Sequence, residues 1–82
     1  MERNDLLILA QRTARLPRKE FDWRDVPEEM RVLYQGSEYY AVGYQIRFKP
    51  NGEPIHTAIL QACNTWGTLI YAPLSEVSMK HG

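Results

Sequence analysis

The stretch that decides the fold runs from Tyr39 to Ala62 and reads YYAVGYQIRFKPNGEPIHTAILQA. From Tyr40 to Phe48, large apolar residues occupy every second position and smaller or polar residues lie between them. A two-residue period is typical of a β-strand with one buried face. From Ile55 onward the stretch is again rich in apolar and β-branched residues, which favour strands. We therefore predict one long β-hairpin.

The turn of this hairpin is predicted at Asn51-Gly52, because Asn-Gly supplies the two positive-φ positions of a type I′ turn. A two-residue loop at this place also determines the register of the two arms. On the face expected to be buried, it pairs aromatic and β-branched residues: Phe48 with Ile55, Ile46 with Thr57, and Tyr44 with Ile59. On the face expected to meet water, it pairs Arg47 with His56 and Gln45 with Ala58.

A helix is predicted over residues 4–16. Apolar residues recur there at three- and four-residue spacing, Asn4 is a suitable N-cap, and Pro17 ends the pattern. Leu7 and Ile8 widen the apolar surface beyond one stripe, so this helix is also a candidate contact with a second copy of the chain. A connector over residues 17–29, basic at its start and acidic afterwards, leads to the β-rich part, residues 30–79.

Shorter strands are predicted on both sides of the hairpin. Residues 30–34 precede it and are joined to it by a tight turn at residues 35–38. Residues 68–72 follow it, then a 3₁₀ turn at residues 73–76 and a last short strand at residues 77–79. So few strands need curvature and a covering helix to bury their apolar face. We expect residues 1–82 to form a single α+β domain, mainly β, with a small curled antiparallel sheet or barrel of four to five strands.

From Met30 to Val77, the order of these elements resembles SH3-like small barrels. In those domains a long bent hairpin is followed by a strand, a 3₁₀ turn and a short closing strand. The segment LIYAPLSEV, from Leu69 to Val77, is similar to that closing part, and Gly43 lies where the long strand would bend. The acidic and aromatic loop signature of peptide-binding SH3 domains is not recognisable. SH3-like barrels serve many functions, so the resemblance implies a fold and no particular activity.

Composition restricts the class of protein. Ten basic and ten acidic residues cancel, so the chain has no overall charge that would attract nucleic acid or an anionic membrane. The longest apolar run, Leu6 to Ala10, is too short to span a bilayer, and no signal-peptide pattern is present. The lone Cys63 cannot form an internal disulfide, which suits a reducing compartment. We expect a cytoplasmic protein.

No pattern in the sequence indicates catalysis, a metal site or a cofactor. His56, Cys63 and His81 are the only soft-metal candidates, and their spacing is not that of a zinc site. The acidic residues of the connector lack the glycine and the alternating oxygen ligands of a calcium loop. Cys63 is expected to be a small buried apolar group, because no acid–base partner is near it in the sequence. We predict no enzyme, no cofactor and no metal.

Aromatic residues supply the leading functional hypothesis. Tyr39 is expected on the outward face of the hairpin, Trp66 in a turn, and Tyr71 nearby. Tyr and Trp often anchor protein interfaces, because they bury a large area at low entropic cost. These three residues predict a non-catalytic module that binds a protein partner. The alternative for Trp66 is a place in the core, over one end of the sheet.

A basic run supplies the second hypothesis, a nucleic-acid-associated accessory protein. Arg12 and Arg15 share one helix face, and with Arg18 and Lys19 they bring four cations that can meet phosphates. Basic residues near the C-terminal end of a helix also complement its dipole, which is the structural alternative. A small-molecule site between copies of the chain is a third hypothesis.

Overall fold

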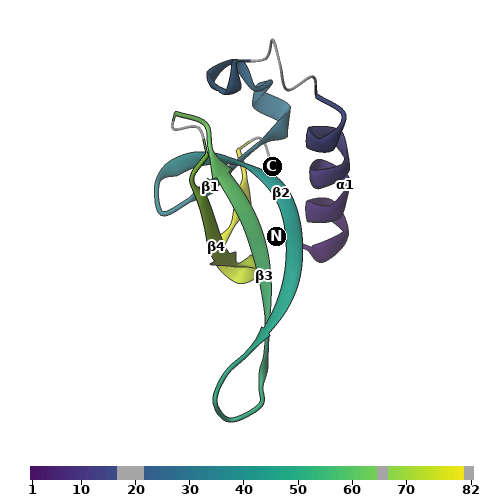
Figure 1. Ribbon diagram of the computed structural model, residues 1–82, viewed down its shortest axis with the longest axis vertical. Coiled ribbons are helices and arrows are strands. Elements are labelled where there is room, and N and C mark those ends of the chain that lie inside the picture. The colour runs from purple at the N-terminus through teal and green to yellow at the C-terminus, as the bar shows by residue number, and fades with distance from the viewer. Residues whose placement is uncertain (17–21, 65–66, 81–82) are drawn as a thin grey trace.

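One helix and five antiparallel strands make up the computed structural model, which describes residues 1–16, 22–64 and 67–80 (Figure 1). In chain order the elements are α1 (Arg3–Ala14), η1 (Trp23–Asp25), η2 (Glu28–Met30), β1 (Arg31–Tyr34), β2 (Ser37–Phe48), β3 (Pro54–Ala62), β4 (Leu69–Pro73), η3 (Leu74–Glu76) and β5 (Ser78–Met79). This confirms the predicted α+β structure, mainly β, with an N-terminal helix. The 3₁₀ turn expected after the fourth strand is also present.

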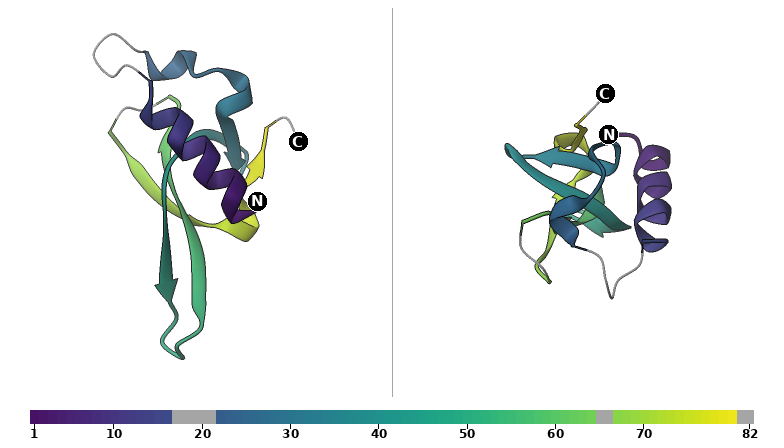
Figure 2. Two further views of the ribbon diagram at one scale, coloured as in Figure 1. Left: turned by 90° about the vertical axis from the view of Figure 1, so that its right-hand side faces the viewer. Right: turned by 90° about the horizontal axis from the view of Figure 1, so that it is seen from above.

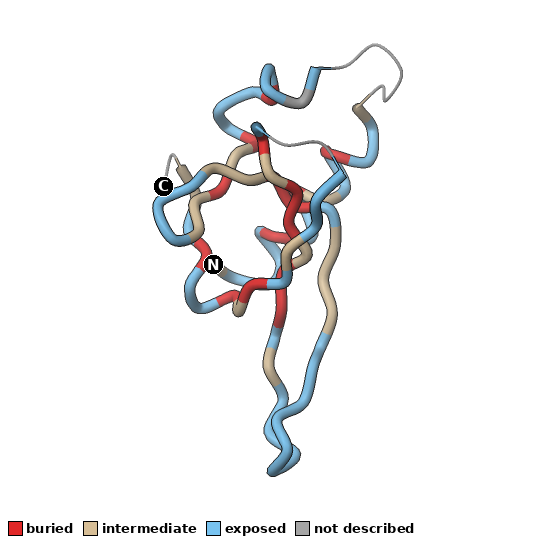
Figure 3. Tube along the Cα trace, turned by 60° about the vertical axis from the view of Figure 1, so that its left-hand side comes forward, coloured by how far each residue is buried: buried red, intermediate tan, exposed pale blue. Residues whose placement is uncertain are grey.

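The strands form one open sheet in the order β4-β3-β2-β1-β5. The sheet curls strongly, so that its trace runs round most of a ring in Figure 3. Its edge strands, β4 and β5, are not paired with each other along the described chain, so the sheet does not close. The barrel alternative is therefore wrong, and the resemblance to SH3-like domains holds only loosely, in the order of the elements.

The helix begins and ends slightly earlier than predicted. Glu2, not Asn4, is the N-cap residue, since Leu6 N donates to Glu2 O at 3.1 Å. At the other end, Arg15 N and Leu16 N donate to carbonyl groups three residues back, which tightens the final turn. The helix lies along one side of the sheet (Figure 2) and contacts β2.

The buried side chains form two clusters. The larger one joins Leu6 and Leu9 of α1 to apolar residues of the sheet and of η3, among them Leu60. The smaller one joins Tyr40 and Cys63 to the segment before β1. Tyr40 and its neighbour Ala41 point to opposite faces of β2, so the two clusters lie on opposite sides of this strand. Figure 3 shows buried residues gathered in the curled part, whereas the hairpin tip is exposed.

The tip of the long hairpin is not the predicted type I′ turn. Gly52 N donates to Lys49 O at 2.9 Å, and Lys49 N donates to Glu53 O at 2.9 Å. Within the loop only Gly52 has a positive φ, +88°. Pro50 restricts its own φ to about −65°, which suits the second position of a type I turn. The loop therefore has three residues, a type I turn followed by a left-handed glycine.

The longer loop changes which residues face each other. The predicted apolar pairs do not form, because every pairing is displaced by one residue: Ile46 faces His56, Gln45 faces Thr57, Tyr44 faces Ala58 and Gly43 faces Ile59. A bulge between Ala41 and Gly43 displaces the register once more. Phe48, predicted to be buried, is 68% exposed, because β1 and β4 do not extend far enough along the hairpin to cover it.

A two-residue turn with positive φ at both positions does occur, at Gln35 (+51°) and Gly36 (+79°) between β1 and β2. Glutamine is strained in this region, whereas asparagine tolerates it and is favoured at the first position of a type I′ turn. We expect Gln35→Asn to raise the free energy of unfolding by about 0.5–1 kcal/mol in urea denaturation. The matched control is Gln45→Asn in β2, where asparagine disfavours the strand. Equal effects of the two changes would contradict this explanation.

Candidate binding surface on the long hairpin

The half of the hairpin nearest its tip extends away from the rest of the molecule (Figures 1 and 2). β1 pairs with β2 only up to Tyr40, and β4 pairs with β3 only up to Thr57. Toward the tip the two arms therefore pair only with each other. This half carries Ile46 and Phe48, both exposed. We name this part, Tyr44 to His56, the hairpin arm.

A shallow groove of about 370 Å³ lies between the hairpin arm and the end of β4. We name it the Arg47 groove. The guanidinium carbon of Arg47 lies 5.3 Å from the centre of the Tyr71 ring, a distance suited to a cation–π contact. Apolar side chains and Lys49 complete much of the lining, and no acidic residue of the described chain lines it.

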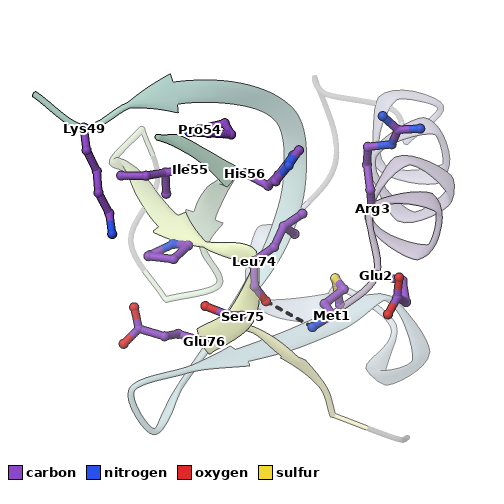
Figure 4. A pocket seen from close by; sticks show the side chains of 11 residues that line it. Met1, Glu2, Arg3, Lys49, Pro54, Ile55, His56, Leu74, Ser75 and Glu76 are labelled. Atoms are coloured by element: carbon purple, nitrogen blue, oxygen red, sulfur yellow. Dashed lines mark hydrogen bonds between the residues drawn. The ribbon is translucent and has the colours of Figure 1, made fainter. Parts of the chain in front are cut away.

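A larger groove of about 670 Å³ lies beside it, between the hairpin arm, η3 and the N-terminal end of α1 (Figure 4). The two grooves share Lys49, Ile55 and Pro73. Basic and acidic side chains both line the larger one, so its charge favours no particular ligand: Arg3 and Lys49 against Glu2 and Glu76.

Two local contacts shape the larger groove. The Met1 ammonium group donates hydrogen bonds to Leu74 O at 3.0 Å and Val77 O at 2.9 Å, the first of which is drawn in Figure 4. A hydrogen bond joins the Tyr44 hydroxyl to His56 Nδ1, and the two rings are stacked with centroids 6.0 Å apart. The contact with Tyr44 orients His56, which lines the groove.

The structure does not bring the predicted aromatic residues together. Tyr71 is 48% exposed and belongs to the Arg47 groove. Tyr39 is only partly exposed and packs against the larger core cluster, with its ring 6.2 Å from that of Tyr34. It lies on the opposite face from Tyr71, because the bulge after Ala41 interrupts the alternation from which its outward position was predicted. Trp66 lies outside the described residues.

The predicted basic site is described only in part. Arg12 and Arg15 are exposed at the C-terminal end of α1, and neither forms an ion pair with another described residue. Arg18 and Lys19 lie outside the described residues. Two of the four basic residues of the predicted site are therefore described, and both are exposed at the C-terminal end of α1.

A cluster of four charged residues, Glu28, Arg31, Glu38 and Lys80, is already paired within the chain. Arg31 Nη1 donates to Glu38 at 2.7 Å, and Lys80 contacts both Glu38 and Glu28. The hydrogen bonds from Lys80, and then from Arg31, hold the pKa of Glu38 below its usual value. Since these charges bind one another, we interpret the cluster as a structural link between the connector, β1 and the C-terminal residues.

Cys63 is buried in the smaller cluster, as predicted, and burial raises the pKa of its thiol. Only the thiolate reacts with 5,5′-dithiobis(2-nitrobenzoate). We expect labelling of the folded protein at neutral pH to be far slower than labelling in concentrated urea, where the thiol is accessible. Equal rates in the two conditions would show that the native thiol is accessible and reactive.

The sequence did not indicate that the hairpin arm is a candidate binding surface. Phe48 is predicted to be buried because it alternates with Tyr44 and Ile46, but the arm extends beyond the strands that would cover it. Pro50 was an available signal for the three-residue loop, since proline suits a type I turn. Arg47 was expected on the water-facing side, but its position over Tyr71 depends on the pairing of β3 with β4, which the sequence does not specify.

Within the described ranges, no three His, Cys, Asp or Glu side chains are grouped to hold a metal ion. The same ranges contain no helix with the length and apolar character needed to cross a membrane. The sequence matches no protein-family model, and the searches of curated proteins and of solved structures likewise found no match.

Proposed function

We propose that this chain is a non-catalytic module that binds a partner protein through the hairpin arm and the neighbouring strand β4. The observation that carries the proposal is the exposure of Phe48 on an arm that pairs only with itself. Burying such an apolar side chain against a partner is favourable, since about 25 cal/mol is gained per Å² of apolar surface removed from water. A cytoplasmic location stays a prediction.

The composition of the surface also supports protein binding. Aromatic residues and arginine are enriched at the centres of protein interfaces. Phe48, Tyr71 and Arg47 lie together on the Arg47 groove. Tyr71 thus remains in the proposed site, whereas Tyr39 serves the core.

Comparative capture tests this proposal. Wild-type protein, Phe48→Ser and Val42→Ser are immobilised and exposed to an extract of the source cells, and retained proteins are quantified by mass spectrometry. Val42 is the matched control, an apolar side chain 39% exposed on β2, outside the arm. We expect a protein that wild type and Val42→Ser retain and Phe48→Ser loses. Identical retention by all three would refute the proposed surface.

The exposed apolar side of α1 is a proposed contact between copies of the chain. If Leu7 and Ile8 mediate self-association, sedimentation will show a dimer of wild type that Ile8→Ser reduces to a monomer. A monomer at every concentration tested removes this proposal and leaves the hairpin arm unaffected.

Nucleic-acid association is a second proposal, supported by the exposure of Arg12 and Arg15 on one helix end. Binding to a mixed-sequence duplex should weaken with salt, with a slope of log affinity against log salt of about −0.9 per phosphate contacted. Arg12→Ala combined with Arg15→Ala should then reduce the slope by about 2. Absence of binding at low salt would eliminate this function.

A further inference from the structure

The Arg47 groove combines uncompensated positive charge with apolar surface, and this combination specifies its partner. We propose that it binds an extended segment of a partner protein in which an Asp or Glu lies next to a large apolar residue. This inference rests on the proposed function and names the chemistry of the segment that the module recognises.

The charge of the groove is one-sided. Arg47 and Lys49 line it, and no acidic residue of the described chain does. Lys49 forms an ion pair with Glu53 at 3.3 Å, but both side chains are largely exposed and such pairs are weak. Among the described residues Arg47 has no carboxylate partner, although the chain as a whole is neutral. A carboxylate from a partner would complement this charge.

The position of Arg47 makes it a suitable carboxylate receptor. The contact with the Tyr71 ring at 5.3 Å restricts the guanidinium group, so part of the entropic cost of orienting it is met before binding. A planar guanidinium can donate two parallel hydrogen bonds to one carboxylate, which an ammonium group cannot do.

The remaining lining accounts for the apolar residue and the extended shape. Phe48, Ile55 and Pro73 are apolar residues of the lining. β4 is an edge of the sheet, and no charged residue interrupts residues 68–73. Half of the backbone polar groups of an edge strand point away from the sheet, so an extended segment can pair along it while its side chains enter the groove.

Selection from a phage-displayed library of random dodecapeptides tests the inference directly. Wild-type protein is the target, and Phe48→Ser is used to remove phage that bind elsewhere. We expect the selected peptides to be enriched in Asp or Glu next to an aromatic or aliphatic residue. The most enriched peptide is then synthesised in two forms, one with its Asp or Glu residue and one with Asn or Gln at that position.

Fluorescence anisotropy measures the affinity of both peptides. We expect Arg47→Ala to bind the acidic peptide about tenfold or more weakly than wild type does. Arg47→Lys should lose less affinity for this peptide. Wild type should bind the amide peptide as weakly as Arg47→Ala binds the acidic peptide. The affinity for the amide peptide should be the same for wild type and Arg47→Ala. Arg12→Ala, an exposed arginine on α1, should stay within about twofold of wild type, and circular dichroism verifies that each variant is folded.

Three results would overturn the inference. They are enrichment of peptides without an acid, equal affinities of Arg47→Ala and Arg12→Ala, and failure of any peptide to enrich on wild type over Phe48→Ser. Each of them leaves the proposed function standing if the capture experiment still shows a partner that depends on Phe48. Loss of that partner dependence is a separate result and refutes the binding surface itself.

Discussion

Replacement of Leu60 by alanine will lower the free energy of unfolding by about 3 kcal/mol, within the range for large-to-small changes in a core. Leu60 lies in β3, is fully buried, and belongs to the cluster that α1 covers. Truncation removes apolar contacts and leaves a cavity that the surrounding strands cannot fill without moving. A domain of this size has a total stability of only about 4–12 kcal/mol, so the loss is a large part of it.

The chain offers a closely matched control, Leu69→Ala in the adjacent strand. Leu69 is 48% exposed, so the same chemical change should cost less than about 0.5 kcal/mol. Urea denaturation followed by circular dichroism measures both midpoints and slopes. If the two variants lost equal stability, the larger cluster would not be the core of the protein.

Arg31→Ala is expected to lower the free energy of unfolding by about 2 kcal/mol, the second-largest effect. The Arg31 side chain is only 18% exposed and donates to three acceptors: Glu38 at 2.7 Å, Val26 O at 2.7 Å and Arg24 O at 2.8 Å. It therefore ties the connector to β1 and β2. Truncation leaves a half-buried carboxylate and two carbonyl groups with one partner fewer.

Arg24→Ala is the control for this change. The ion pair of Arg24 with Asp22 joins two exposed side chains, so its loss should leave the urea midpoint almost unchanged. Arg31→Lys should be intermediate, because lysine keeps the charge but cannot reach the carboxylate and both carbonyl groups at once. Hydrogen exchange of residues 22–30 should become faster in Arg31→Ala than in Arg24→Ala. Unchanged exchange there would mean that Arg31 does not hold the connector.

Local patterns were sufficient for the elements and their order. Alternation in residues 39–62 predicted both arms of the long hairpin, and three- and four-residue spacing predicted α1 within two residues at each end. Each signal is read within one segment and depends on the period of a strand or a helix. Burial of Cys63 was predicted in the same way, from the usual behaviour of a lone cysteine.

The candidate site was less accessible to sequence reasoning. Its exposed residues depend on the register of β2 with β3, and the register depends on the turn and on the bulge after Ala41. A bulge has no reliable local signal, because it is one unpaired residue in an otherwise regular strand. Tyr39 was therefore assigned to the wrong face. Phe48 does share a face with Tyr44, as predicted, but it is exposed because neither β1 nor β4 extends far enough to cover it.

By itself, the sequence determined that a helix precedes a long hairpin and further short strands, because periodicity is a local property of the chain. The tertiary structure decided that the sheet stays open, that the hairpin arm projects, and that Arg47 lies over Tyr71 beside Phe48. These features depend on which strands meet and in what register. Such pairing is selected by the free energy of the whole packed molecule, through contacts between residues far apart in the chain.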